Sequence, residues 1–219
     1  MDASGGTFDQ NVFINCPFDG QYKPLLRALL FTLIYCGLTP RIASERGDSG
    51  EVRITKILEL IKACKYSIHD LSRMEPLETG DLPRFNMPFE LGLDIGCKET
   101  ATGELAGKKS LILERERFRY QRVLSDLSGN DIKDHHGEPQ RLVRQVRHWL
   151  VGNVNPVLPT GTEVWEGFNR FCDLFDKETR KLGYKQADLD EMTVTEEIYF
   201  INLFLGRILR KPPRRRSRK

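Results

Sequence analysis

Short apolar runs alternate with longer segments of helical periodicity along the first half of the chain, and this alternation most restricts the fold. The runs typical of strands lie at 11–15, 39–43, 66–71 and 110–114. Between the first two, segment 22–36 repeats apolar residues at the i, i+3, i+4 spacing of a helix. Strands joined through helices predict right-handed crossovers and a parallel sheet. We therefore expect an α/β protein with a Rossmann-like, flavodoxin-type parallel sheet flanked by helices, with a C-terminal helical extension.

Domain organisation follows from the elements that remain. A Gly- and Pro-containing loop at 75–83 precedes a helix that carries Glu90, and a segment rich in Gly, Pro and Asn at 152–161 is the best internal boundary. Further elements are expected as helices at about 52–64, 141–151, 163–182 and 189–209 and a short strand within 130–136. Asp48 or Ser49 can cap the first of these helices. We predict three parts, namely an α/β domain over 1–151, a helical extension over 152–209 and a disordered basic tail over 210–219.

Composition favours a soluble globular protein. Charged residues make up 30% of the 219 residues and the hydrophobic set 39%, and no apolar run approaches the roughly 20 residues that a membrane span needs. The first residues have neither a basic nor an apolar targeting region, so we expect a cytoplasmic protein without membrane contact. The cysteines are odd in number, widely spaced and never in a CxxC arrangement. They predict small buried side chains in a reducing compartment, and no disulfide framework or zinc site.

The positive charge is concentrated at the C-terminal end. From Arg207 onward the chain carries eight Lys or Arg residues and no acid, whereas the net charge of the whole chain is only +3. The rest of the chain is therefore mildly acidic. A Pro- and Arg-rich end cannot bury apolar surface, which is why we expect it to be disordered. Two uses stay open: a solvated charge run, or contact with an acidic protein or a nucleic acid through Arg214, Arg215, Arg216 and Arg218.

Two carboxylates stand where ligands bind in a parallel α/β sheet. Asp70 ends the apolar run 66–71, and Glu90 lies in the helix start F-N-M-P-F-E-L-G-L at 85–93. An acid at a strand end and an acid in the first turn of the next helix both point into the crevice of the sheet, so we expect the two to face one cleft. The alternative is that Asp70 caps a turn and Glu90 only favours the helix N-terminus. His69 alternates to the opposite side of the strand, where we expect a packed or hydrogen-bonded histidine.

Residues in the loops at the strand ends complete the predicted site. Phe18 can stack on a base, although core packing is the alternative, and Ser49 with the following helix N-terminus can hold a phosphate. No metal site is expected because the histidines lack partners at metal-ligand spacing, and no Walker lysine motif or GxGxxG is present. The residues expected to bind substrate are Asn15, Phe18, Arg41, Asp48, Ser49, Arg84 and Asn86.

These motifs resemble those of the nucleoside 2-deoxyribosyltransferase family, in the same order and at comparable separations. The shared features are V-F-I-N-C-P-F at 12–18, Asp70 after the third strand and F-E-L-G at 89–92. In that family the glutamate of the F-E-L/I-G motif attacks the anomeric carbon of the sugar, and an aspartate after the preceding strand assists. The resemblance covers about residues 11–115. It implies that Glu90 is the nucleophile and Asp70 the assisting acid.

The same plan is similar to that of Toll/interleukin-1 receptor (TIR) domains, in which a V-F-I-S strand and a glutamate on a later helix serve NAD glycohydrolysis. Chains that combine D-S-G-x-x-R with F-N-M-P-F-E-L-G, as this one does, look like bacterial TIR-like proteins, some of them associated with antiphage defence. The deoxyribosyltransferases place a further aspartate six residues before the glutamate, where it helps to recognise or protonate the base, and this chain has Arg84 at that position. A positive residue there suits a phosphorylated ligand.

Two functions are therefore expected, from different classes. The first is an N-glycosidase that cleaves the N-glycosidic bond of NAD or a related nucleotide through Glu90, as a defence effector, with the nucleotide as substrate and no cofactor. Nicotinamide is already a cationic leaving group, so the loss of a base-protonating aspartate does not prevent its release. The second is a non-catalytic TIR-like module that senses a nucleotide or recruits a partner. The apolar helices after 189 also suit a homo-oligomer or a defence-system protein partner.

Overall fold

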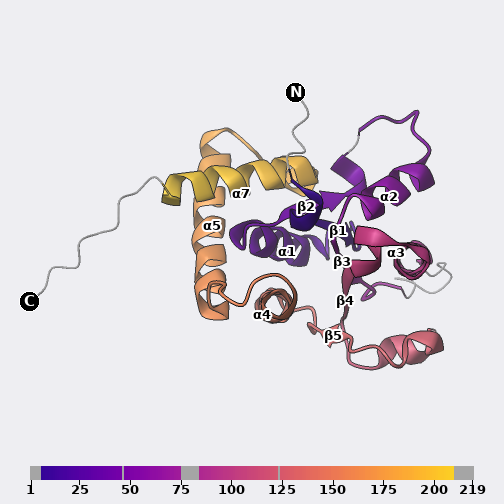
Figure 1. Cartoon of the computed structure of the whole chain (residues 1–219). Helices are drawn as coiled ribbons and strands as arrows, with labels where there is room; N and C mark the ends of the chain where they lie inside the picture. The colour runs from indigo at the N-terminus through magenta and orange to yellow at the C-terminus, as the bar shows by residue number, and fades with distance from the viewer. Residues whose placement is uncertain (1–5, 46, 75–83, 123, 210–219) are drawn as a thin grey trace, which may run out of the picture.

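The computed structural model describes residues 6–45, 47–74, 84–122 and 124–209 (Figure 1). Five parallel strands form one sheet in the order β2-β1-β3-β4-β5, which is the 2-1-3-4-5 order of flavodoxin-like proteins. The predicted fold class is confirmed. The strands are β1 (Asn11–Asn15), β2 (Thr39–Ile42), β3 (Tyr66–Asp70), β4 (Lys109–Glu114) and β5 (Lys133–Asp134). The helices are α1 (Lys23–Tyr35), α2 (Arg53–Lys62), α3 (Asn86–Thr100), α4 (Pro139–Asn153), α5 (Gly161–Lys181), α6 (Gln186–Asp190) and α7 (Val194–Leu209).

Strand β1 is central because β2 and β3 pair with it on either side. Ile14 of β1 lies beside Ile42 of β2 and Ile68 of β3. The chain reaches β2 from β1 through α1 on one face, and it leaves β3 through α3 on the other. The connections that follow β1 and β3 therefore run to opposite faces of the sheet. At such a point a parallel sheet has a crevice at the carboxyl ends of the two strands, here β1 and β3, and ligands bind there.

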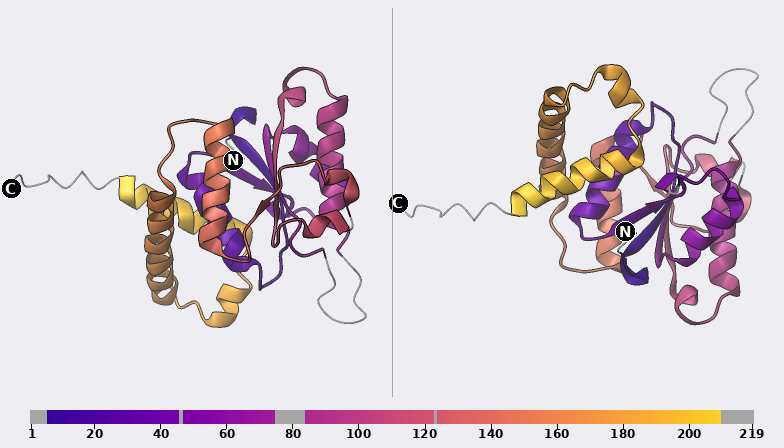
Figure 2. Two further views of the ribbon diagram at one scale, coloured as in Figure 1. Left: turned by 90° about the horizontal axis from the view of Figure 1, so that it is seen from below. Right: turned by 90° about the horizontal axis from the view of Figure 1, so that it is seen from above.

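Alternate residues of β1 pack against different helices, which gives the protein its layers (Figure 2). Val12 and Ile14 belong to the apolar cluster that contains α1 and α4. Phe13, between them, packs with Ile57 and Ile61 of α2, and α3 covers the same face of the sheet. The period of two along a strand thus separates an α1–α4 face from an α2–α3 face.

The ends of the helices follow local signals, with one correction. Helix α1 ends just before Gly37, whose φ of +83° is the left-handed conformation common after a helix. Helix α2 was expected to be capped by Asp48 or Ser49, and this is wrong, since Val52 precedes the helix without a side-chain cap. Asp48 instead accepts the Gly50 N–H at 2.9 Å within its own exposed turn.

The expected single helix over 189–209 is also wrong, because it is divided into α6 and α7. Thr193 begins α7 with reciprocal hydrogen bonds to Glu196. The Thr193 N–H donates to the Glu196 carboxylate at 2.8 Å, and the Glu196 N–H donates to Thr193 Oγ1 at 3.3 Å. This is the T-x-x-E capping box, which starts a new helix after a turn.

Helices α5 and α7 form an outer layer over α1 (Figures 1 and 2). Phe31 of α1 is buried, and its ring lies 5.6 Å from that of Phe168, 5.5 Å from that of Phe171 and 6.1 Å from that of Phe204. These aromatic rings come from three helices and share one apolar cluster with the sheet. The helical extension is therefore packed on the α/β part through a continuous core.

Polar contacts hold the same outer layer in place. Arg27 Nε and Nη2 donate to the Glu197 carboxylate of α7 at 2.8 and 2.7 Å, and the guanidinium lies over the Phe175 ring of α5. Lys23 Nζ donates to the backbone oxygen of Leu189 at 2.6 Å, at the end of α6. Cationic side chains of α1 thus contact α5, α6 and α7.

Some expectations fall on residues outside those described. They are the loop 75–83 and the basic tail over 210–219, including the arginines considered for nucleic-acid contact. Among the described ranges, no helix combines the length and the apolar character needed to cross a membrane.

Truncating the aromatic contact between α1 and the outer layer should strongly destabilise the whole protein. We expect Phe31→Ala to lower the free energy of unfolding by about 3–5 kcal/mol, because a buried ring is replaced by a cavity. Urea denaturation followed by circular dichroism measures this. The control Val157→Ala, at an 83% exposed side chain, should stay within about 0.5 kcal/mol of the wild type. A loss below about 1 kcal/mol for Phe31→Ala would contradict the shared core.

Candidate active site

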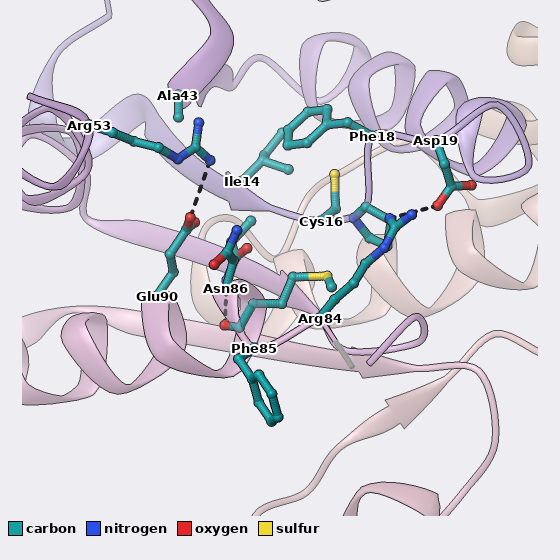
Figure 3. A pocket seen from close by; sticks show the side chains of 13 residues that line it. Ile14, Cys16, Phe18, Asp19, Ala43, Arg53, Arg84, Phe85, Asn86 and Glu90 are labelled. Carbon is teal, nitrogen blue, oxygen red and sulfur yellow. Dashed lines mark hydrogen bonds and ion pairs between the residues drawn. The ribbon is translucent and has the colours of Figure 1, made fainter. Parts of the chain in front are cut away.

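A pocket of about 550 Å³ opens at the carboxyl end of β1, on the face covered by α2 and α3 (Figure 3). Its walls come from the loop after β1, the end of β2, the first residue of α2 and the start of α3. The volume is within the range of small-molecule sites, and the place is the crevice expected for this strand order. The lining residues are Ile14, Asn15, Cys16, Pro17, Phe18, Asp19, Ala43, Arg53, Arg84, Phe85, Asn86, Met87 and Glu90.

Glu90 presents a mostly buried carboxylate to this pocket. It is the fifth residue of α3, so the expectation that it stands in the first helical turn is wrong. The helix dipole acts most strongly within the first turn, and Glu90 lies beyond it. Its side chain is 8% exposed, and Oε1 lies 3.5 Å from Arg53 Nη2 (Figure 3). Burial raises the pKa of Glu90, and the charge of Arg53 counteracts this only in part. Carboxylates with a raised pKa in a cleft are common among functional residues.

A buried chain of hydrogen bonds runs from the pocket wall into the sheet. Asn15 Nδ2 donates to the Met87 backbone oxygen at 2.8 Å and lies 3.0 Å from His69 Nδ1. Because the Met87 carbonyl oxygen can only accept, the Asn15 atom that faces it is the amide nitrogen, and this nitrogen donates to both Met87 and His69. His69 Nδ1 therefore accepts, and Nε2 is left to donate to Asp94 Oδ2 at 3.0 Å. The prediction of a hydrogen-bonded His69 is confirmed, and the orientation of the Asn15 amide is fixed.

Asp94 ends this chain and anchors α3 to the sheet. Ser67 Oγ and Ser110 Oγ donate to its Oδ2 at 2.5 and 3.0 Å, and Lys108 Nζ lies 3.2 Å from Oδ1. Burial raises the pKa of Asp94, but the imidazole hydrogen bond, helped by the lysine and serine, outweighs it and holds the pKa below its usual range. Because these partners lie in β3, in β4 and just before it, they fix the rotation of α3. Glu90, one turn earlier, is thereby held toward the pocket.

A second ion pair stands across the pocket from Glu90 (Figure 3). Arg84 Nη1 donates to Asp19 Oδ2 at 3.0 Å. The other oxygen of Asp19 accepts the Tyr22 N–H at 3.1 Å, just before α1, and Arg73 lies 3.6 Å from Oδ2. Asp19 is therefore held by the backbone and by two cations.

Asp70 is part of a separate buried cluster. Its Oδ2 accepts from Tyr22 Oη at 2.5 Å and from His135 Nε2 at 3.0 Å, and its Oδ1 accepts the Ser72 N–H at 2.9 Å. Burial raises the pKa of Asp70, but the hydrogen bond and charge of His135, with the other two donors, outweigh it and lower the pKa. The side chain is fully buried and does not line the pocket.

The expectation that Asp70 and Glu90 face one cleft is therefore wrong. Alternation along β3 directs Asp70 toward the α1–α4 face, whereas His69 points to the α2–α3 face, where Glu90 lies. The sequence correctly indicated that these two neighbours diverge. It did not indicate which face α3 covers. Asp70 connects β3 to α1 and to the segment after β5, and this structure gives it no contact with the pocket.

Four of the seven residues expected to bind substrate line the pocket together. They are Asn15, Phe18, Arg84 and Asn86. Phe18 is 50% exposed, which rules out core packing as its role. Its ring is among the side chains that line the pocket, where a flat ring could stack on it (Figure 3).

The other three lie elsewhere. Arg41 Nη2 is 2.6 Å from Glu45 Oε1, an ion pair between β2 and the turn that follows it. Asp48 and Ser49 occupy the exposed turn before α2. The pocket that the described residues form does not include any of the three.

The lining also contains Arg53, Asp19 and Cys16, three polar or ionisable residues that were not predicted as site residues. Arg53 and Asp19 are polar residues in the segments that follow strand ends, and such segments were expected to form the site. The sequence pattern alone did not distinguish these two from the other polar residues there. Cys16 follows β1 directly and is buried. Burial raises the pKa of the Cys16 thiol, and the charges of Asp70 and Glu90 raise it further, so the thiol stays protonated and is a poor nucleophile.

The pocket thus combines a buried carboxylate, an oriented amide, two guanidinium groups and an exposed aromatic ring. Such a set can hold a sugar against Glu90, a ring against Phe18 and an anion beside Arg53 or Arg84. In the described part of the chain, no group of three or more His, Cys, Asp or Glu side chains could hold a metal ion. All five cysteines are free thiols. Comparison of the chain with models of protein families, with curated proteins and with solved structures found no match.

The two carboxylates should respond differently to neutralisation. We expect Asp70→Asn to lower the free energy of unfolding at neutral pH by about 1–3 kcal/mol, because a buried, hydrogen-bonded charge is lost. A lowered pKa means that this contribution is present above the ordinary aspartate pKa and disappears as pH falls through the lowered value. The difference from wild type should therefore shrink in acid, as urea denaturation at several pH values would measure.

Asp131→Asn is the matched control, since that side chain is 84% exposed. It should change the unfolding free energy by less than about 0.5 kcal/mol at every pH. If Asp70→Asn were as stable as the wild type at neutral pH, the buried cluster would not stabilise the fold.

Proposed function

We propose that the protein is an N-glycosidase that cleaves the N-glycosidic bond of NAD or a related nucleotide, with Glu90 acting on the anomeric carbon. The position of Glu90 carries the proposal. Its carboxylate is 8% exposed, lines the pocket at the carboxyl end of β1 and has one cationic partner, Arg53, that is itself largely exposed. Asp19, the other acid in the lining, is already engaged with the backbone and with Arg84.

The chemistry of the bond explains why a carboxylate is needed. Breaking the bond between ribose and base builds positive oxocarbenium character at the anomeric carbon. A negative charge held beside that carbon stabilises the transition state, and the stabilisation is larger where less water surrounds the charge. In the covalent route, a Glu90 oxygen forms a bond to the anomeric carbon while the base departs with the bonding electrons. Water then displaces Glu90 and loses a proton, which leaves the sugar hydrolysed and the carboxylate restored.

Among the described residues, the pocket lining offers no second carboxylate that is free to protonate a base, and this favours a leaving group that needs no proton. Asp70 lies on the other face of the sheet, and Asp19 is ion-paired, so no lining residue in the described part of the chain offers a proton to a departing base. Nicotinamide in NAD is cationic and departs as a neutral molecule without one. A purine base generally departs from its nucleoside more easily when the base is protonated. This contrast supports NAD over an uncharged nucleoside.

The resemblance of the motifs to bacterial TIR-like proteins supports a role as a defence effector. Phe18 would contact a ring of the nucleotide, and Asn15 and Asn86 would bind its polar groups. A homo-oligomer or another protein of a defence system would then control when the site is active.

Replacing the Glu90 carboxylate should remove activity without loss of stability. Glu90→Gln keeps the shape of the side chain but lacks the negative charge, and we expect base release to fall by at least about a hundredfold, as removal of a nucleophile does. A raised pKa means that the ionised form is disfavoured in the folded state, so the neutral variant should be no less stable at neutral pH. Nicotinamide or free-base release is measured beside a thermal melt.

The matched control is Glu99→Gln on the exposed side of the same helix, which should keep wild-type activity. A Glu90→Gln variant that retains more than about a tenth of the rate, a loss of less than about 1.4 kcal/mol in transition-state stabilisation, would mean that Glu90 is not the nucleophile. If the wild type cleaves no nucleotide of a panel in any assembly state, the alternative function replaces this one. The chain would then be a non-catalytic module that senses a nucleotide or recruits a partner.

A further inference from the structure

Every charged side chain that lines the pocket within the described residues is engaged with an opposite charge. Arg53 faces Glu90 on one side, and Arg84 faces Asp19 on the other (Figure 3). A guanidinium has five N–H donors, so a phosphorylated ligand that contacts an arginine in this pocket either shares it with the carboxylate that the arginine already faces or displaces that carboxylate. The two pairs would respond differently to such displacement.

The Arg84–Asp19 pair is the more firmly held of the two. Its hydrogen bond is 3.0 Å long, and Asp19 also accepts the Tyr22 N–H. If Arg84 turned toward a ligand, Arg73 would still stand 3.6 Å from the Asp19 carboxylate. Movement of Arg84 therefore leaves no carboxylate without a cation.

The Arg53–Glu90 pair is looser, and its loss has a larger consequence. The closest nitrogen–oxygen distance is 3.5 Å, beyond the usual range for a hydrogen bond to a carboxylate, and the Arg53 side chain is 63% exposed. Because this contact is long and the guanidinium is mostly exposed, a phosphate that offers two oxygens to the guanidinium can replace the carboxylate. Glu90 would then be mostly buried and without a cation.

We propose that Arg53 is a specificity-determining residue that couples recognition of a phosphate to the release of Glu90. Its guanidinium faces Glu90, and a phosphate on the substrate draws it away. An unphosphorylated nucleoside leaves Arg53 beside Glu90 and is a poor substrate. This inference rests on the proposed function, because it assigns the substrate class and the control of that same site.

The coupling has a physical basis in the transition state. A mostly buried carboxylate without a countercharge is unfavourable, and the positive charge that develops on the sugar supplies the missing partner. Binding energy from the phosphate, remote from the reacting bond, is thereby used at the anomeric carbon. While Arg53 stays in place, its guanidinium already compensates part of the negative charge of Glu90.

Arg53 is the group near Glu90 that is able to move. The titratable and charged groups that face Glu90 are Arg53 from α2, His69 from β3 and Cys16 from the loop after β1, with Asp94 one turn along α3. His69 is held by hydrogen bonds at both ring nitrogens, and Cys16 is buried with a protonated thiol. Arg53 alone in this group is mostly exposed.

This arrangement makes anion binding depend on pH in a definite direction. Protonation of Glu90 removes the charge that holds Arg53, so a phosphate should bind more tightly as pH falls through the Glu90 pKa. By linkage, the bound phosphate should raise that pKa by the same free energy.

Calorimetric titration of the full chain with ADP-ribose, whose phosphates keep their charge across the range, tests this without any cleavage. The wild type should bind progressively more tightly as pH falls from 8 to 4, by several-fold over that range. Glu90→Gln should bind at pH 8 as tightly as the wild type does in acid, with no dependence on pH. Arg53→Met should bind at least several-fold more weakly, also without that dependence. The matched control Arg84→Met should bind more weakly and keep the wild-type dependence on pH.

Two outcomes would overturn the inference. One is an Arg53→Met variant that keeps the affinity or the pH dependence of the wild type, and the other is a wild type that does not bind ADP-ribose. Failure of the proposed function is a separate result, since a wild type that binds in the expected way but releases no base would lack the cleavage activity and still use Arg53 as described. Where cleavage is found, Arg53→Met should reduce the preference for NAD over nicotinamide riboside at least tenfold.

Discussion

Asp94 is a buried carboxylate on the side of α3 that faces the sheet, and the position of the candidate active site depends on its contacts. It accepts hydrogen bonds from Ser67 and His69 of β3 and Ser110 of β4, and it lies beside the buried ammonium group of Lys108. Burying a negative charge is unfavourable unless such partners are all in place. Helix α3 cannot turn about its axis without leaving that charge unpaired. This constraint holds Glu90 toward β1, and it also holds His69, whose second nitrogen orients Asn15.

Asp70 and Glu90 differ because one charge is part of the fold and the other is not. Asp70 accepts a set of hydrogen bonds that lowers its pKa, and removing its charge would weaken the hydrogen bonds that Tyr22 and His135 donate to it. Glu90 has one exposed partner, and burial raises its pKa. A charge that the fold does not require, in a pocket at the switch point of a parallel sheet, is free to change partners with a ligand. That freedom is what catalysis or ligand sensing needs.

The sequence predicted the fold because the alternation of strands and helices is a local pattern that survives in the structure. It predicted Glu90 and four of the lining residues because loops at the ends of parallel strands converge. It misplaced Asp70, since a period of two separates neighbours on a strand without telling which face the next helix covers. That face depends on the crossover from β3 to β4, which involves the whole sheet. The capping pair Thr193–Glu196 is different, because the T-x-x-E pattern is a local signal that is sufficient to predict the start of α7.

The most direct test of the account is a crystal structure of the protein with a non-cleavable carbocyclic analogue of NAD. If Glu90 acts on the anomeric carbon, the carbon atom in the equivalent position of the analogue should lie within about 3.5 Å of a Glu90 carboxylate oxygen, the separation of groups poised to react. The nicotinamide should occupy the same pocket. An analogue bound outside this pocket, or bound in it with that carbon turned away from Glu90, would contradict the account.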